Sequence, residues 1–304
     1  MVTTASALRG FMAALVTPVD RHGEVDAAGL QRVVARVLAG GASGACPVGS
    51  TGEGPRLTPE QRLAAVEAVR DLVPPSVPVI PAPAAMTARH AVREIAAFAG
   101  AGADACLLAP PAYFPMADEE IVRYYRTVAT DSALPLLLYN IPAVTKVRIG
   151  PPVAAALASH PSIIGLKDSS RDLEGLQALV YATAGEDFTV LTGSDTILLA
   201  SLVVGAQGAI AASANLVPEL GVAVYEAVRE ERWSDAAAHQ RKLFDVIQAC
   251  RVGGLGVGWK AALELAGVCS GAPVPPAAPL AADARAALAR RLAALGVLGA
   301  ARER

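Results

Sequence analysis

The sequence predicts an α/β fold, a (β/α)₈ TIM barrel with a C-terminal helical extension, and three observations predict it. Eight short apolar runs alternate with segments of helical pattern, as in repeated βα units. The runs start 20 to 33 residues apart, which leaves room for a strand, a helix and two connections. Only helical patterns follow the eighth run. We therefore expect a barrel over residues 8–218 and a helical extension over residues 219–304.

The candidate strands share a run of buried-type residues that ends close to a turn or a helix start. They are residues 11–16, 44–49, 77–82, 105–110, 135–140, 163–168, 188–193 and 208–213.

Capping residues mark the helices between these strands. Asp26, Thr58 and Thr87 each precede a helical segment, and Asp118 begins an acidic first turn, as expected at helix N-termini. Three helix ends carry a glycine suited to the left-handed conformation before the next strand, namely Gly41, Gly102 and Gly205. The extension reads as helices over residues 219–232, 234–251, 258–267 and 281–295.

A doubly wound open sheet is the alternative fold. Such a sheet would need a glycine-rich G-x-G-x-x-G turn after an early strand to bind a dinucleotide. The first strand is followed instead by residues 17–20, Thr-Pro-Val-Asp. The barrel is therefore favoured.

Composition and charge exclude several classes of partner. The formal net charge is −2 and 53% of the 304 residues are hydrophobic, so neither nucleic acid nor an anionic membrane surface is an expected partner. The uncharged run 196–218 contains polar residues and reads as a helix and a buried strand, not a membrane span. The four cysteines form no C-x-x-C pair. We expect a cytoplasmic protein without a metal ion or cofactor.

Lys167 is the strongest candidate for a reactive residue. Only four of the 26 lysine and arginine residues are lysine, so the chain uses arginine where a positive charge suffices. Lys167 ends an apolar strand at the barrel mouth, where partial loss of hydration favours the neutral amine. A neutral amine can attack a ketone and form a Schiff base. An ion pair with a carboxylate such as Asp168 is the equally weighted structural alternative.

Two further segments would face the same barrel mouth. Tyr139 ends the preceding strand, and its phenol can relay protons beside an imine-forming lysine; packing with one hydrogen bond is its alternative. Ser50 and Thr51 lie in the turn at residues 49–54, whose glycines let amides and hydroxyls converge on an anion. A tight turn without a ligand remains open for this segment, and Glu53 is expected to have a structural role.

Taken together, three motifs resemble the dihydrodipicolinate synthase and N-acetylneuraminate lyase family. They are Gly-Ser-Thr-Gly-Glu at residues 49–53, Tyr-Asn-Ile-Pro at 139–142 and Gly-Leu-Lys-Asp at 165–168. The resemblance runs from about Gly10 into the C-terminal helices. It implies a (β/α)₈ barrel and a homotetramer that is a dimer of dimers.

The resemblance also implies roles for individual residues. Lys167 would form the Schiff base with pyruvate or another 2-oxo acid, and Tyr139 would be its acid–base partner. Ser50 and Thr51 would hold the carboxylate. Thr51 would also link Tyr139 to Tyr113 of a neighbouring subunit. Ile210 corresponds to an apolar residue whose backbone faces the bound 2-oxo acid.

One departure from the family pattern bears on the substrate. Dihydrodipicolinate synthases carry an arginine two residues after the proline of the Tyr-Asn-x-Pro motif, where it binds aspartate semialdehyde, and Val144 stands there. Ser169, Asp195 and Ser213 end later strands and can hydrogen-bond a hydroxylated chain.

We therefore expect a class I aldolase that splits a 2-keto-3-deoxy or 4-hydroxy-2-oxo acid into pyruvate and an aldehyde. Dihydrodipicolinate synthase, N-acetylneuraminate lyase and a dehydratase using the same imine are alternatives. A non-catalytic barrel that binds a 2-oxo acid as a regulator is the competing class. A phosphate-binding barrel enzyme ranks lower, because Asp195 stands where a phosphate would be repelled.

Overall fold

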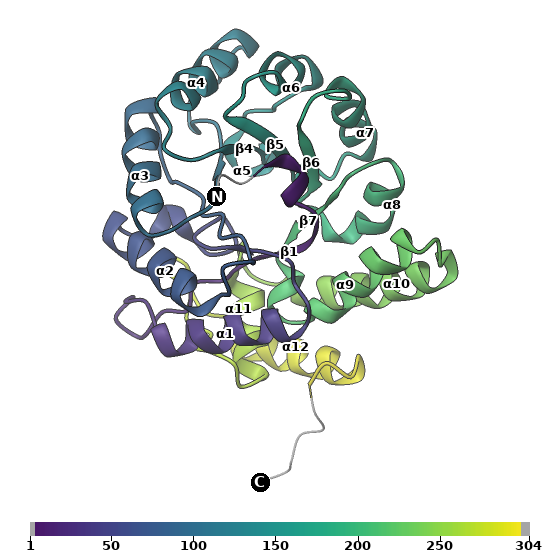
Figure 1. Ribbon diagram of the computed structural model, residues 1–304. Helices are drawn as coiled ribbons and strands as arrows, with labels where there is room; N and C mark the ends of the chain where they lie inside the picture. The colour runs from purple at the N-terminus through teal and green to yellow at the C-terminus, as the bar shows by residue number, and fades with distance from the viewer. Residues whose placement is uncertain (1–3, 299–304) are drawn as a thin grey trace.

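Parallel strands form a barrel inside a ring of helices, in a computed structural model that describes residues 4–298 (Figure 1). Seven strands are hydrogen-bonded in the order β2-β1-β7-β6-β5-β4-β3. Their bounds are β1 Gly10–Ala14, β2 Ala45–Cys46, β3 Cys106–Leu108, β4 Leu136–Asn140, β5 Ile163–Asp168, β6 Thr189–Thr192 and β7 Gly208–Ala211. The predicted barrel is confirmed, and each of these strands overlaps a predicted run.

The third predicted strand, residues 77–82, lies between β2 and β3 without forming a regular ladder. Pro78 and Pro81 lack the N–H that a ladder needs. The segment still bonds to both neighbours: Ala45 donates its N–H to the Pro78 carbonyl at 2.9 Å, and Asp104 donates to the Val79 carbonyl at 2.9 Å. The barrel therefore closes through this segment. The sequence pattern predicted a regular strand here, and the two prolines prevent it because they lack N–H donors.

Twelve α-helices cover the outside of the barrel and extend it within the described residues. They are α1 Ala27–Ala39, α2 Pro59–Leu72, α3 Ala88–Gly100, α4 Asp118–Asp131, α5 Pro142–Thr145, α6 Pro151–Ala158, α7 Leu173–Ala182, α8 Leu198–Val203, α9 Pro218–Arg229, α10 Trp233–Cys250, α11 Val257–Leu265 and α12 Ala282–Ala294. Short 3₁₀ turns occupy Ala5–Ala7, Gly54–Arg56, Asp195–Ile197 and Ser213–Asn215.

The helix starts predicted at Asp26, Thr58 and Thr87 are confirmed by their caps. The Asp26 carboxylate accepts the N–H of Gly29, and Thr58 forms a reciprocal capping box with Gln61. The three predicted glycines, Gly41, Gly102 and Gly205, all have positive φ. These local signals place each strand start at the end of the preceding helix.

Alternation along the strands divides the core in two. Leu136 and Leu138 face the layer between sheet and helices, whereas Leu137 and Tyr139 face the barrel interior. This follows from the period of two in a β-strand. Since Tyr139 pairs with Lys167 in the parallel register of β4 and β5, both side chains belong to the interior set.

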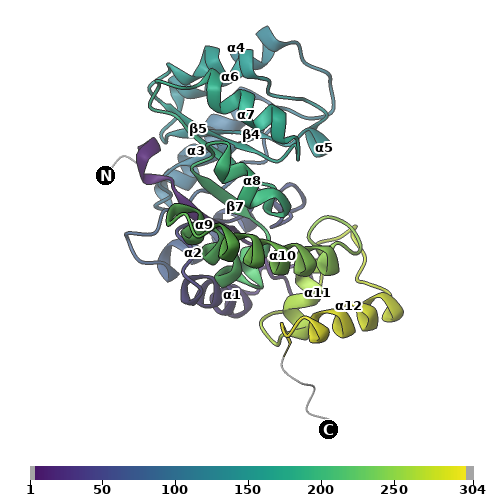
Figure 2. The same ribbon diagram turned by 90° about the vertical axis from the view of Figure 1, so that its right-hand side faces the viewer.

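The last helices pack against one side of the barrel (Figure 2). α9 lies on β1, where Gly221 leaves room for the ring of Phe11, and α12 packs on α10 and α11. The division at residue 218 stays a prediction. No helix within residues 4–298 has both the length and the apolar character needed to cross a membrane.

Candidate active site

A cavity of about 380 Å³ opens where the barrel strands end, and most predicted site residues line it. The lining residues from the prediction are Ser50, Thr51, Tyr139, Lys167, Ser169, Asp195 and Ile210. They come from β4, β5, β7 and the turns after β2, β5 and β6. The C-terminal ends of parallel barrel strands thus meet at one cavity, as this architecture requires.

Lys167 and Tyr139 are neighbours inside this cavity. The Nζ atom of Lys167 lies 3.4 Å from the Tyr139 Oη atom and 4.4 Å from the centre of the ring. Each residue is only 5% exposed. Within residues 4–298, Lys167 makes no ion pair. The proposed alternative, a pair with Asp168, is not formed because successive residues of a strand face opposite sides.

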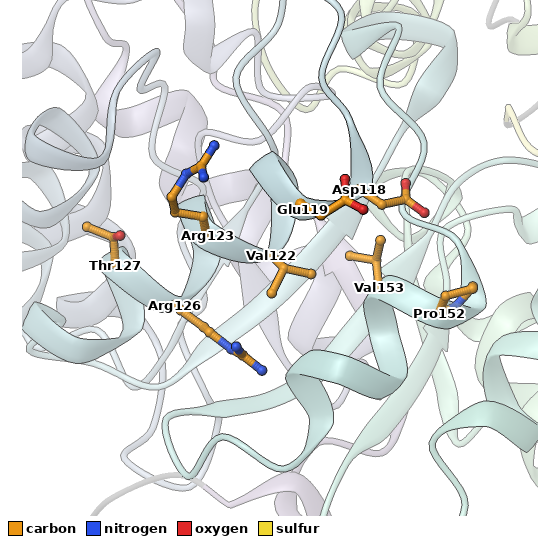
Figure 3. Close-up of a pocket in the computed structure, with 8 residues that line it drawn as sticks. All are labelled: Asp118, Glu119, Val122, Arg123, Arg126, Thr127, Pro152 and Val153. Atoms are coloured by element: carbon orange, nitrogen blue, oxygen red, sulfur yellow. The ribbon is translucent and has the colours of Figure 1, made fainter.

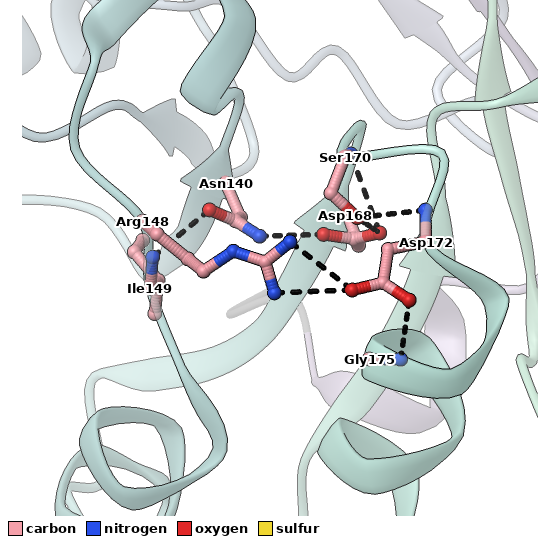
Figure 4. Close-up of polar contacts among 7 residues, drawn as sticks. All are labelled: Asn140, Arg148, Ile149, Asp168, Ser170, Asp172 and Gly175. Atoms are coloured by element: carbon pink, nitrogen blue, oxygen red, sulfur yellow. Dashed lines mark hydrogen bonds and ion pairs between the residues drawn. The ribbon is translucent and has the colours of Figure 1, made fainter.

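Asp168 instead organises the turn behind the cavity (Figure 4). Its carboxylate accepts a hydrogen bond from the Asn140 Nδ2 atom at 2.6 Å and from the Ser170 Oγ atom at 2.7 Å. Burial raises the pKa of Asp168, although both hydrogen bonds oppose the shift. The Asn140 Oδ1 atom accepts the N–H of Ile149 at 2.9 Å. This network ties the end of β4 to the end of β5, the strand that carries Lys167.

The turn after β2 brings two hydroxyl groups to the cavity. Tyr139 Oη lies 3.4 Å from Ser50 Oγ, while Thr51 lines the wall beside it. The backbone of Gly54 lies close to that of Val48, and a Cβ atom at Gly54 would overlap the Val48 carbonyl. The glycine is therefore required for the turn.

Glu53 has the structural role predicted for it. Its side chain is buried, and its Oε2 atom lies 2.6 Å from the Nζ atom of Lys260, which has no exposed surface. Glu53 also accepts the N–H of Val274 at 3.1 Å and pairs with Arg56. These contacts tie the β2 turn to α11. Sequence reasoning missed the role of Lys260, because no local pattern pairs residues so far apart.

Asp195 lies in the wall of the cavity, whereas Ser213 does not. Asp195 lines the cavity and accepts the backbone N–H of Ser213 at 3.1 Å. Burial raises the pKa of Asp195, and its hydrogen bonds from Ser213 oppose the shift. Ser213 is fully buried and lies outside the cavity lining. The structure therefore does not bring the Ser213 side chain to the cavity, although the Ser213 backbone supports Asp195.

Tyr113 is separated from these residues in the single chain. It is 84% exposed, has a φ of 86°, and packs edge-on against the exposed Phe114. Val144 lines the cavity, so the position of the missing family arginine does face the same space.

Among the lining residues that sequence reasoning missed are Arg171, Arg251 and Trp259. Arg171 follows β5 in a turn, Arg251 directly follows α10, and Trp259 lies in α11. Nothing in the local sequence separates these arginines from surface arginines, since only the folded chain brings them to the barrel mouth.

A second groove lies between α4 and α6 and holds none of the predicted residues. Asp118, Glu119, Arg123 and Arg126 lie along α4, and Val153 of α6 faces them (Figure 3). The described residues contain no cluster of three or more histidine, cysteine, aspartate or glutamate side chains suited to a metal ion.

Comparisons with known proteins agree with this geometry. The family model of the dihydrodipicolinate synthetase family matches residues 7–295. An uncharacterized DapA-like lyase of Halobacterium salinarum is 37% identical over 291 residues, covering 96% of this chain and 95% of the relative. A 4-hydroxy-tetrahydrodipicolinate synthase of Methanosphaerula palustris is 31% identical over 281 residues, covering 92% and 96%.

A solved structure extends the likeness to the fold. YagE of E. coli K12, a prophage protein of the dihydrodipicolinic acid synthase family solved with pyruvate, superposes with a TM-score of 0.90 at 30% identity. The superposition covers 95% of this chain and 99% of that chain. With the barrel and its lysine and tyrosine already described, these matches show that the chain belongs to the dihydrodipicolinate synthetase family.

Proposed function

We propose that the protein is a pyruvate-dependent class I aldolase that splits a 2-keto-3-deoxy or 4-hydroxy-2-oxo acid into pyruvate and an aldehyde. The observation that carries the proposal is the buried Lys167 amine, 3.4 Å from the Tyr139 hydroxyl and without a carboxylate partner among residues 4–298. A structural lysine in a protein core is normally paired. An unpaired amine beside a phenol is the arrangement that imine chemistry needs.

The first half of the reaction joins the amine to the substrate ketone. The Lys167 nitrogen attacks the C2 carbonyl carbon, and the oxygen takes up a proton to give a carbinolamine. Loss of that oxygen as water leaves the protonated imine. Tyr139 lies within reach of the nitrogen and Ser50, so its hydroxyl is placed to carry the protons in these steps.

The second half breaks the carbon–carbon bond. A base removes the proton of the C4 hydroxyl, and the C3–C4 bond breaks. Its electron pair forms the C2=C3 double bond while the C=N π pair moves to the imine nitrogen, which gives an enamine. The aldehyde leaves. Protonation at C3 and hydrolysis then release pyruvate and regenerate the amine. Tyr139 is the proposed proton acceptor, and Ser50 and Thr51 hold the carboxylate of the 2-oxo acid.

Val144 favours aldol cleavage over dihydrodipicolinate synthesis. Its apolar side chain lines the cavity where the family resemblance places an arginine for aspartate semialdehyde. A site that lacks a charged partner for a carboxylate loses a large part of its discrimination. Aspartate semialdehyde is therefore expected to be a poor second substrate.

The test is a screen for pyruvate release. The purified protein is incubated with 2-keto-3-deoxygluconate and with 4-hydroxy-2-oxoglutarate, and pyruvate is measured with lactate dehydrogenase. We expect release that is absent in Lys167→Ala. Turnover of only pyruvate plus aspartate semialdehyde would contradict the proposal, and release unchanged in Lys167→Ala would assign the activity to another group.

We also propose a homotetramer, arranged as a dimer of dimers, in the cytoplasm. Tyr113 and Phe114 are 84% and 71% exposed, a large apolar surface for an isolated chain. In this arrangement Tyr113 reaches the active site of the neighbouring subunit, where Thr51 links it to Tyr139. The four cysteines are free and buried, which favours a reducing compartment. Sedimentation velocity and the activity of Tyr113→Phe test the assembly.

A further inference from the structure

Two arginines from different parts of the chain line the cavity that holds Lys167. Arg171 lies in the turn between β5 and α7, and Arg251 follows the last residue of α10. Both side chains are exposed at the cavity. Within residues 4–298, neither guanidinium group has an ion-pair or hydrogen-bond partner. Since an arginine presents five N–H donors suited to a carboxylate or phosphate, the pair predicts an oxyanion ligand.

Arg171 has a strained backbone conformation, which a network of hydrogen bonds maintains. Its φ of 64° is left-handed, a conformation that costs conformational energy in a residue with a side chain. The residues around it are fixed: Ser170 Oγ donates to Asp168 at 2.7 Å, and the Asp172 N–H donates to Ser170 Oγ at 3.2 Å. Asp172 also pairs with Arg148 at 3.1 Å (Figure 4). Strain maintained by such a network is typical of functional positions.

Arg251 faces a like charge. Burial lowers the pKa of Arg251, the positive charge of Arg171 lowers it further, and Asp195 opposes both effects. No carboxylate lies within ion-pair distance of either arginine in the described part of the chain. A bound anion would relieve the repulsion between the two guanidinium groups.

Arg171 lies across the barrel mouth from the turn that carries Ser50 and Thr51. In the strand order, β5, which precedes Arg171, is four positions from β2, which precedes the Ser50 turn. Around an eight-membered barrel, four positions is the opposite side. Arg171 follows Lys167 by four residues, so their Cα atoms lie at most about 14 Å apart. A substrate held at its 2-oxo acid end by Ser50 and Thr51 would extend past Lys167 toward the arginines.

We propose that Arg171 and Arg251 bind a carboxylate or phosphate at the far end of the substrate, so that the aldehyde product carries this anionic group. The proposal rests on the proposed aldolase function and names the substrate class. Asp195 and Ser169 line the same cavity and would contact the hydroxylated carbons between the two ends.

The experiment uses three substrates that differ only at C6. They are 2-keto-3-deoxygluconate with a neutral end, 2-keto-3-deoxyglucarate with a carboxylate and 2-keto-3-deoxy-6-phosphogluconate with a phosphate. We expect kcat/KM for one or both anionic substrates to exceed that of the neutral one by about 10- to 100-fold. The anionic substrate with the larger increase in kcat/KM shows whether the arginines bind a carboxylate or a phosphate.

Two variants and a matched control locate the effect. Arg171→Gln and Arg251→Gln are expected to remove most of this preference, mainly by raising KM for the anionic substrates. Arg123→Gln removes the same charge from the α4 groove (Figure 3) and should retain the preference. Equal kcat/KM for all three substrates in the wild type, or a preference that survives both cavity variants, would overturn the proposal.

A binding measurement separates this proposal from the aldolase function. Gluconate, glucarate and 6-phosphogluconate lack the C2 ketone and form no imine, so calorimetry reports non-covalent binding, and the difference between the acids reports the arginine site. We expect tighter binding of an anionic-ended acid than of gluconate, lost in Arg171→Gln and Arg251→Gln. Equal binding of the three acids would refute the arginine site even where borohydride traps pyruvate on Lys167. Failure of trapping together with selective binding would refute only the aldolase function.

Discussion

Gly193 is the position where a single methyl group should disable Lys167 without unfolding the barrel. A Cβ atom built on Gly193 would lie 2.6 Å from the Lys167 Cε atom and would overlap Ser169 Oγ. Carbon atoms in contact are normally about 3.5 to 4.0 Å apart, so Cε must move by about 1 Å. Misplacing a reacting group by that distance costs about 100-fold in rate. Gly193→Ala should therefore slow imine formation with pyruvate by about two orders of magnitude.

The assay measures the rate of borohydride trapping and the unfolding midpoint together. Gly193 does not have a positive φ, and the atoms it would strike belong to side chains, so the unfolding free energy should change by only about 1 kcal/mol. Gly100→Ala is the control, because a Cβ atom there meets nothing within 4 Å. A Gly193→Ala protein that is folded and traps pyruvate at the wild-type rate would refute the placement of Lys167.

Three further variants test the acid–base partner, the hydrogen bonds from Asn215 to β1, and a buried carboxylate. Tyr139→Phe removes the hydroxyl 3.4 Å from Lys167 Nζ and should slow pyruvate release by about 10²- to 10⁴-fold with little change in thermal midpoint; wild-type turnover would contradict this. Asn215 accepts the Val16 N–H at 3.0 Å and donates to two carbonyls, so Asn215→Ala should lower the unfolding free energy by about 3 kcal/mol, measured in urea. A loss below about 0.5 kcal/mol would contradict it. Burial raises the pKa of Asp195 from 3.8, so wild-type stability should fall as pH rises from about 4 through the folded-state pKa. Asp195→Asn should lack this loss, and its advantage over wild type should grow with pH; a difference independent of pH would refute the assignment.

Local sequence patterns predicted most of the fold because each boundary has a short-range cause. Caps such as Asp26 and Thr58, and left-handed glycines such as Gly41, act within a few residues. The segment at residues 77–82 departs from the pattern, because its prolines remove ladder donors while its position in the barrel is kept. The apolar residues of the segment predicted its place in the barrel. The missing N–H groups of its prolines prevented a regular strand.

The candidate site was predictable where residues end strands. Tyr139 and Lys167 were expected at one mouth, and the parallel register places them as partners. Ser213 follows a strand as well, yet it is buried outside the cavity lining, since a strand end alone does not fix side-chain direction. Arg251 reaches the cavity from α10, and Lys260 reaches Glu53 from α11. Such contacts depend on how the extension packs, which local sequence does not encode.

The most direct measurement is mass spectrometry of the protein after incubation with pyruvate and sodium borohydride, followed by peptide mapping. We expect one reduced pyruvate adduct for each chain, located on Lys167 and absent from Lys167→Ala. A chain that remains unmodified, or an adduct on Lys146, Lys242 or Lys260, would contradict it.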